Sequence, residues 1–109
     1  MQTLNKPRNR SLKQLFAKLK DKAKVRNIKI TLTFKQFCKL REKTCRYCNN
    51  ILPEAGYGVD RLNNKLGYTV KNSVPCCSKC NKAKMEMSER DFMCHIEAIY
   101  KTAKKRGTL

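Results

Sequence analysis

The fold is decided by residues 45–84, which read CRYCNNILPEAGYGVDRLNNKLGYTVKNSVPCCSKCNKAK. The stretch contains two CxxC pairs with 28 residues between them (residues 49–76). A CxxC turn places two thiolates on one side of a tight knuckle, and two knuckles complete a tetrahedral site for Zn²⁺. A single pair would leave redox chemistry as a strong alternative, but two pairs favour a metal. We predict one structural zinc ion, bound by Cys45, Cys48, Cys77 and Cys80.

The chain has seven cysteines, so three lie outside this set. Cys76 offers a CxxxC spacing to Cys80, but the CxxC spacing favours Cys77, and we place Cys76 in the core. Cys38 has apolar neighbours and is predicted to be a core thiol. We expect Cys94 and the adjacent His95 to be surface or core residues of the last helix. The odd number of cysteines argues against a disulfide framework, and the polar, basic N-terminus does not resemble a secretory signal. Both observations favour a reducing, cytoplasmic location.

The net charge is +18, from 26 basic and 8 acidic residues. Residues 1–44 hold 14 Lys/Arg and 2 Asp/Glu, a net of +12, and residues 45–109 hold 12 and 6, a net of +6. Self-repulsion of this size favours a polyanionic partner. We predict nucleic acid, with DNA favoured over RNA and an acidic membrane surface or protein as the alternative. No apolar run approaches the roughly 18 residues of a membrane span. The chain is expected to be a monomer or a homodimer.

The N-terminal part divides into a flexible basic tail, residues 1–10, and a basic helical extension, residues 11–44. Ser11 is a good N-cap for a first helix, and Thr33 and Gln36 match a capping box for a second helix that runs to about Lys43. Residues 27–32 are β-branched and alternating, which predicts either a strand or an extended connector. The apolar residues that recur at helical spacing in the first helix are Leu12, Leu15, Phe16, Leu19 and Ala23.

Residues 45–87 form the predicted core unit, and residues 88–109 a C-terminal helix with a frayed end from Lys104. Within the core we expect a strand at residues 56–62, a turn at 63–67, a return strand at 68–70, a loop at 71–75 and a helix from about Cys77 or Ser78 to Met85. Ser88 begins the last helix, whose apolar stripe contains Phe92, Ile96, Ile99, Tyr100 and Ala103.

Taken together, the two CxxC pairs, the segment VDRLNNKLGYT (residues 59–69), Asn72 and the segment CSKCNKAK (residues 77–84) resemble the HNH endonucleases. The likeness is to the small phage-type members with zinc knuckles, which makes a virus-encoded protein an expectation. It covers about 40 residues closely. The resemblance implies a small α+β fold in which a ββα-metal unit with a structural zinc is flanked by amphipathic helices.

The resemblance also assigns roles by position. Asp60 and Asn81 would be the protein ligands of a catalytic Mg²⁺ or Mn²⁺, which suits the preference of hard cations for oxygen. Asn72 would orient the general base or the backbone of its loop. Phosphate and nucleic-acid contacts would come from basic residues of the motif, namely Arg61, Lys65, Lys82 and Lys84.

The sequence departs from the family at Arg61, where the general-base histidine is expected. Arginine stays protonated and cannot accept a proton from water. Some HNH-like nucleases carry the same Asp-Arg pair together with a tyrosine, for which Tyr57 and Tyr47 are candidates. Arg61 would then hold the phosphate with its forked donors. Two alternatives remain: water activated by the ion alone, and a catalytically inactive domain.

These patterns predict a metal-dependent HNH-type endonuclease that hydrolyses phosphodiester bonds, with Asp60, Arg61, Asn72 and Asn81 as its catalytic residues. The first alternative is an inactive, zinc-stabilised module that binds DNA or RNA, for example within a ribonucleoprotein. The second is a zinc ribbon of the transcription type or a protein-interaction module. The joint presence of Asp60, Asn72 and Asn81 favours the enzyme, because simple binding of nucleic acid requires no such set.

Overall fold

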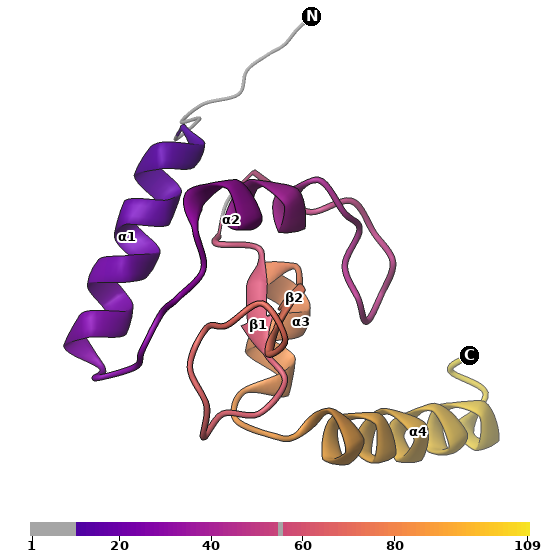
Figure 1. The fold of residues 1–109 in the computed structure, drawn as a ribbon. Helices are drawn as coiled ribbons and strands as arrows, with labels where there is room; N and C mark the ends of the chain where they lie inside the picture. The colour runs from indigo at the N-terminus through magenta and orange to yellow at the C-terminus, as the bar shows by residue number, and fades with distance from the viewer. Residues whose placement is uncertain (1–10, 55) are drawn as a thin grey trace, which may run out of the picture.

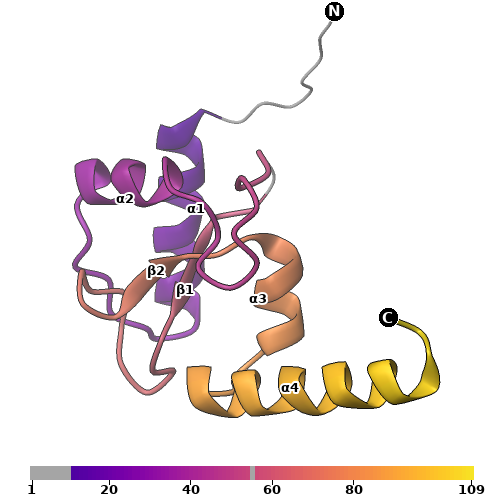
Figure 2. The ribbon, with the colours of Figure 1, turned by 90° about the vertical axis from the view of Figure 1, so that its right-hand side faces the viewer.

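The structure is a computed structural model that describes residues 11–54 and 56–109. Its elements are, in chain order, α1 (Leu12–Val25), α2 (Phe34–Arg41), β1 (Val59–Arg61), β2 (Ser73–Pro75), α3 (Ser78–Lys84) and α4 (Glu89–Arg106). Figures 1 and 2 show the β1–β2 pair between α1 on one side and α3 on the other. This is the predicted small α+β fold. The predicted basic tail, residues 1–10, lies outside the described residues.

The two N-terminal helices begin at the predicted caps. Ser11 and Thr33 each form a complete capping box, with Gln14 and Gln36 as the reciprocal partners. The helices pack together over the sheet, and Phe37 is fully buried at the centre of the contact. The core cluster that they build contains Leu15, Phe16, Leu19, Leu32, Phe37 and Val59. Only Val59 in this set comes from the predicted core unit, so the helical extension supplies most of the main core.

The predicted return strand at residues 68–70 is wrong. The strand that pairs with β1 is Ser73–Pro75, which the sequence analysis assigned to a loop, with Asp60 opposite Val74. Tyr68 pairs instead with the connector between α1 and α2: its N–H donates to the carbonyl of Lys29 at 2.8 Å, and its carbonyl accepts from Thr31 N–H at 3.0 Å.

Gly67 allows this close approach, because a Cβ there would lie 2.3 Å from the Lys29 carbonyl oxygen. Asn27 is a turn residue with φ 58°, and the connector from residue 28 to residue 32 forms a single parallel bridge, between Ile30 and Tyr68. The N–H and the carbonyl of Tyr68 both form hydrogen bonds with the connector and so are not available to pair with β1. The strand that pairs with β1 therefore begins later, at Ser73.

The third and fourth helices begin where the sequence predicts. Cys77 caps α3, and Ser88 caps α4 by accepting a hydrogen bond from Asp91 N–H. The predicted fraying from Lys104 is wrong: α4 continues to Arg106 and closes on Gly107 in the left-handed conformation. The helix projects from the rest of the chain (Figures 1 and 2).

The apolar stripe of α4 is mostly uncovered. Phe92 is buried and packs edge-on against Tyr47, but Ile96, Ile99 and Tyr100 are about half exposed. No helix in the described part of the chain is long and apolar enough to cross a membrane.

Candidate functional site

Four sulfur atoms converge as the CxxC spacing predicted. The Sγ atoms of Cys45, Cys48, Cys77 and Cys80 all lie within 4.8 Å of one another. Sulfurs about 2.3 Å from a central ion stand about 3.8 Å apart in a tetrahedron. The Cys48 and Cys77 sulfurs are 3.8 Å apart, so this donor set can hold a metal ion.

The backbone of each knuckle supports negative charge on sulfur. The N–H of Tyr47 donates to Cys45 Sγ and the N–H of Cys80 donates to Cys77 Sγ, both at 3.4 Å. Burial opposes ionisation of Cys45, but backbone hydrogen bonds at Tyr47, Cys48 and Cys77 outweigh it and lower the pKa of Cys45 to about 6. Burial and hydrogen bonds to the neighbouring sulfurs raise the pKa of the Cys80 thiol, so the four sulfurs share protons in the absence of a cation. Thiolate is the ligand form of cysteine.

The other cysteines lie outside this cluster. Cys76 is buried, its Sγ contacts the carbonyl of Cys77 at 3.4 Å, and burial raises the pKa of its thiol, as expected for a core residue. Cys94 and His95 are exposed on α4. Cys38 is half-buried, less enclosed than the predicted core thiol.

Asp60 is buried and contacts two other side chains. It lies on β1, is 5% exposed, and its Oδ2 accepts a hydrogen bond from the Tyr47 hydroxyl at 3.1 Å. The same oxygen lies 3.0 Å from the Nζ of Lys84, which is fully buried. Lys84 also donates to the carbonyl of Arg61 at 3.2 Å. The expectation that Lys84 contacts a phosphate is therefore wrong in this fold, because its ammonium is enclosed as the counter-ion of Asp60.

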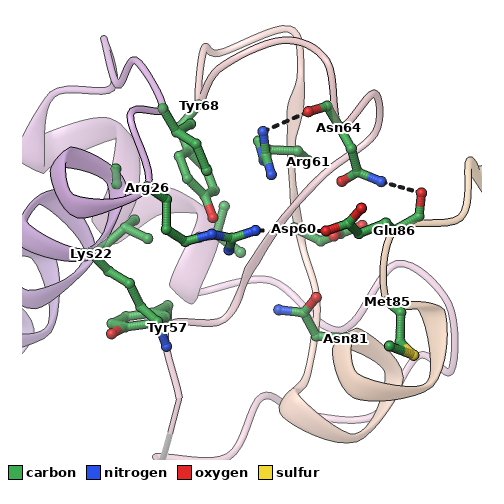
Figure 3. A pocket seen from close by; sticks show the side chains of 14 residues that line it. Lys22, Arg26, Tyr57, Asp60, Arg61, Asn64, Tyr68, Asn81, Met85 and Glu86 are labelled. Atoms are coloured by element: carbon green, nitrogen blue, oxygen red, sulfur yellow. Dashed lines mark hydrogen bonds and ion pairs between the residues drawn. The ribbon is translucent and has the colours of Figure 1, made fainter.

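The second carboxylate oxygen of Asp60 has no hydrogen bond within the described part of the chain, and Asp60 lines a pocket of about 140 Å³. Asn81, half-buried on α3, lines the same pocket, as does Arg61 (Figure 3). Asp60 and Asn81 therefore share one cavity, which brings together two of the oxygen-bearing side chains that the sequence singled out.

Arg61 is buried, and part of its guanidinium forms hydrogen bonds with the loop that follows β1. Its Nη1 donates to the carbonyl of Asn64 at 2.9 Å and to that of Leu66 at 3.0 Å, and the guanidinium lies over the ring of Tyr68 at 5.4 Å. Arginine carries five N–H donors, so this pattern leaves other donors of Arg61 for the pocket. Lys65 and Lys82 are exposed.

Asn72 does not reach the pocket. Its side chain accepts from Asn63 N–H at 2.9 Å and donates to the carbonyls of Asn63 at 3.0 Å and Gly67 at 2.9 Å. Of the two roles expected for Asn72, the structure supports orientation of the loop backbone. The loop that Asn72 closes is the one that carries the carbonyl partners of Arg61.

The two candidate tyrosines differ. Tyr47 donates to Asp60, and burial followed by the Asp60 charge raises the pKa of its hydroxyl far above its ordinary value, so it is unsuited to accept a proton. Tyr57 lines the pocket, with the ammonium of Lys22 5.8 Å from its ring centre. Tyr68 also lines the pocket (Figure 3), and sequence reasoning missed it because the residue was assigned to a return strand.

Sequence reasoning also missed the wall of the pocket that α1 provides. Lys22 of this helix and Arg26, its C-cap residue, line the pocket, and Glu86 lines it from the segment after α3 (Figure 3). Arg26 Nη2 lies 4.0 Å from Glu86 Oε2. No local signal distinguishes these residues from the other lysines of α1, because only packing decides which face of the helix meets β1.

No family model matches this chain. It is 36% identical over 87 residues to an uncharacterized protein of Acanthamoeba polyphaga mimivirus, a match that covers 78% of this chain. The chain spans only 16% of the length of that relative. Among solved structures it is similar to the rare-cutting HNH restriction endonuclease PacI, with a TM-score of 0.64 and 24% identity over 89% of this chain and 82% of that one. The chain therefore has the fold of an HNH endonuclease.

Proposed function

We propose that this chain is a metal-dependent HNH-type endonuclease that hydrolyses phosphodiester bonds of DNA. The observation that carries the proposal is the pocket that Asp60, Asn81 and Arg61 line together. A carboxylate and an amide oxygen suit Mg²⁺ or Mn²⁺, and a cationic side chain beside them suits a phosphate. The fold shared with an HNH restriction endonuclease supports the same reading.

In this proposal the four cysteines bind a structural Zn²⁺. Sulfur donors at tetrahedral spacing fit zinc, and a closed set of four leaves no position for water. The site joins the knuckle after α2 to the first turn of α3, which carries Asn81. Reduced cysteines of this kind fit a reducing, intracellular compartment, and the mimivirus relative supports a viral origin.

The catalytic ion, held by Asp60 and Asn81, would neutralise charge that develops on the phosphate. The chain's own residues would prepare the site. Tyr47 and Lys84 both bind one oxygen of Asp60 and so fix the position of its carboxylate in the pocket wall. Arg61 would hold a phosphate oxygen with the donors that its loop does not use. Tyr57 is the candidate proton acceptor that lines the pocket.

One observation favours the alternative of an inactive binding module. The negative charge of Asp60 is already balanced by the ammonium of buried Lys84, so folding requires no cation beside this carboxylate. An ion that binds Asp60 must share this carboxylate with an ammonium 3.0 Å away. The two functions therefore differ in whether a divalent ion enters the pocket.

Cleavage of plasmid DNA by the purified, zinc-loaded chain in Mg²⁺ or Mn²⁺ tests the proposal. Asn81→Ala should reduce the rate by at least about 100-fold, the lower range for removal of a catalytic group. Asn50→Ala, an exposed amide outside the pocket, is the matched control and should cut like the wild type. Asp60→Asn should also lose activity while keeping the shape of the side chain. Tight DNA binding without cleavage by the wild type under any divalent ion would establish the inactive module instead.

A further inference from the structure

We propose that Lys22 of α1 and Arg26, the C-cap residue of that helix, bind backbone phosphates of the nucleic acid that enters the pocket. The nucleic-acid interface is then shared between the N-terminal helix and the core unit. The inference rests on the proposed function in that its ligand is nucleic acid, but it does not require cleavage. It assigns to two residues outside the motif a role that the likeness to HNH proteins does not supply.

The geometry places both side chains at the site. Lys22 lies in the last turn of α1, and Arg26, four residues further on, is the C-cap of that helix, so both side chains leave the same side of the helix end. Leu19 and Ala23, which also line the pocket, are buried and fix this face against β1. Figure 3 shows the Arg26 side chain extending from α1 across the pocket toward Glu86.

The charges at the pocket favour an anion. Three cationic side chains line it, from Lys22, Arg26 and Arg61. With buried Lys84, which pairs with Asp60, they give four positive charges against the two carboxylates of Asp60 and Glu86, a net of +2 (4 minus 2). A divalent ion on Asp60 would add further positive charge. A phosphodiester backbone supplies one negative charge per nucleotide and matches this surplus.

The Arg26–Glu86 contact is weak enough to be exchanged. Its atoms are 4.0 Å apart, and the side chains of Arg26 and Glu86 are 49% and 81% exposed. Exposed ion pairs at this distance contribute little. A phosphate oxygen can therefore replace the carboxylate at Arg26, with Glu86 moving into solvent. Glu86 then acts as a competitor for the phosphate site.

The same helix offers a matched control. Lys20 and Lys24 have the same spacing as Lys22 and Arg26, but they lie over a shallow depression on another face together with Asp21. The double substitutions Lys22→Gln/Arg26→Gln and Lys20→Gln/Lys24→Gln each remove two positive charges from α1. General electrostatic attraction predicts equal effects from the two pairs, whereas direct phosphate contact predicts a difference.

The experiment measures binding of a labelled DNA duplex by anisotropy over a range of KCl concentrations, using zinc-loaded Asn81→Ala chain without added Mg²⁺ or Mn²⁺. Loss of two phosphate contacts makes the slope of log K against log salt shallower by about 1.8, since each contact contributes about 0.9. We expect this change for Lys22→Gln/Arg26→Gln and less than half of it for the control pair. Lys22→Arg/Arg26→Lys should retain the wild-type slope, which would separate lost charge from damage to the helix.

Glu86→Gln provides an independent measurement. Removing the competitor should tighten DNA binding more than Glu97→Gln, which makes the same charge change on α4, away from the pocket. Equal slope changes for the two double variants, or equal effects of Glu86→Gln and Glu97→Gln, would overturn the inference and leave the nuclease proposal standing. A wild-type chain that binds no DNA would overturn both. Loss of cleavage with the slope difference intact would overturn only the nuclease proposal.

Discussion

At the scale of single residues, the most consequential feature is the ion pair between Asp60 and Lys84. Both side chains are buried, and each would be costly without the other, because an uncompensated charge in the interior loses its hydration. Tyr47 and the Arg61 carbonyl satisfy further bonds of the pair. The network fixes the carboxylate that the proposed function needs, and it explains why a lysine of the motif is buried.

Lys84→Met is therefore expected to destabilise the chain by about 3–5 kcal/mol, since it leaves Asp60 buried and unpaired. Adding Asp60→Asn to this variant should recover much of the loss, because both charges are then gone. Urea unfolding of the zinc-loaded chains measures these differences. Lys82→Met, an exposed lysine on the same helix, should change stability by less than about 0.5 kcal/mol. Equal losses for Lys82 and Lys84 would show that the pair is not buried in solution.

At the scale of elements, α3 depends on its neighbours. It has seven residues, too few for an isolated helix to be stable. Its N-cap is Cys77, and Cys80 lies in its first turn, so two of the four sulfurs belong to the start of this helix. A metal ion bound there would fix the helix that presents Asn81 to the pocket.

We expect Cys80→Ser to lose the bound metal and the helical signal of α3, because metal binding and folding are coupled in small sites of this kind. Metal content by mass spectrometry and backbone signals by NMR provide the measurement, with one zinc per wild-type chain. Cys94→Ser, an exposed cysteine outside the cluster, is the control and should retain the metal. Full metal retention by Cys80→Ser would contradict the four-cysteine site.

The start of α4 is attached to the first knuckle by Arg46 and Glu89. The Arg46 Nε lies 2.6 Å from Glu89 Oε1 and Nη2 lies 3.1 Å from Oε2, a two-bond pair. The hydrogen bond from Arg46 lowers the pKa of Glu89. Beyond Phe92 the helix has few contacts with the core, so this pair and the Phe92–Tyr47 ring contact hold it in place.

A lowered carboxyl pKa gives stability that is present above the unfolded pKa of about 4.3 and is lost as the pH falls through the folded value. We expect Glu89→Gln to cost no more than about 1 kcal/mol near neutral pH, because the pair is partly exposed. The difference in unfolding free energy between wild type and variant should shrink on acidification. Using the difference cancels acid release of the metal, which both chains share. A difference that grows on acidification would contradict this assignment.

At the scale of the whole molecule, the N-terminal helices and the core unit (residues 45–87) pack into one core. Phe37 and the α1 residues Leu15, Phe16 and Leu19 enclose Val59 of β1, and the connector before α2 pairs with Tyr68. The pocket itself lies between α1 and the β1–α3 unit. The helical extension is therefore a wall of the candidate site as well as a source of positive charge.

A fragment of residues 45–109 loaded with zinc should consequently lack a cooperative unfolding transition, since it retains one of the six main-core residues. Calorimetry of the fragment and of the complete chain provides the comparison. A fragment of residues 11–109 keeps the whole described core and should unfold like the complete chain. Cooperative unfolding of the shorter fragment would show that residues 45–109 fold without the N-terminal helices.

The sequence by itself determined the features that depend on local spacing. The CxxC pairs predicted the sulfur cluster, and the caps at Ser11, Thr33 and Ser88 predicted three helix starts, because both signals act within a few residues. The motif around Asp60 predicted the HNH fold, which the likeness to PacI confirms.

Only the tertiary structure decided the features that depend on contacts between distant segments. The partner of β1 is residues 73–75 because Tyr68 satisfies its backbone against the connector at Lys29. Lys84 is buried because Asp60, 24 positions earlier in the chain (84 minus 60), meets it across the sheet and α3. Lys22 and Arg26 line the pocket, unlike the other lysines and arginines that the structure describes in the N-terminal part, because α1 packs its face with Leu19 and Ala23 against the core unit. These three features depend on the burial of side chains and on hydrogen bonds between distant segments, which a local sequence pattern does not encode.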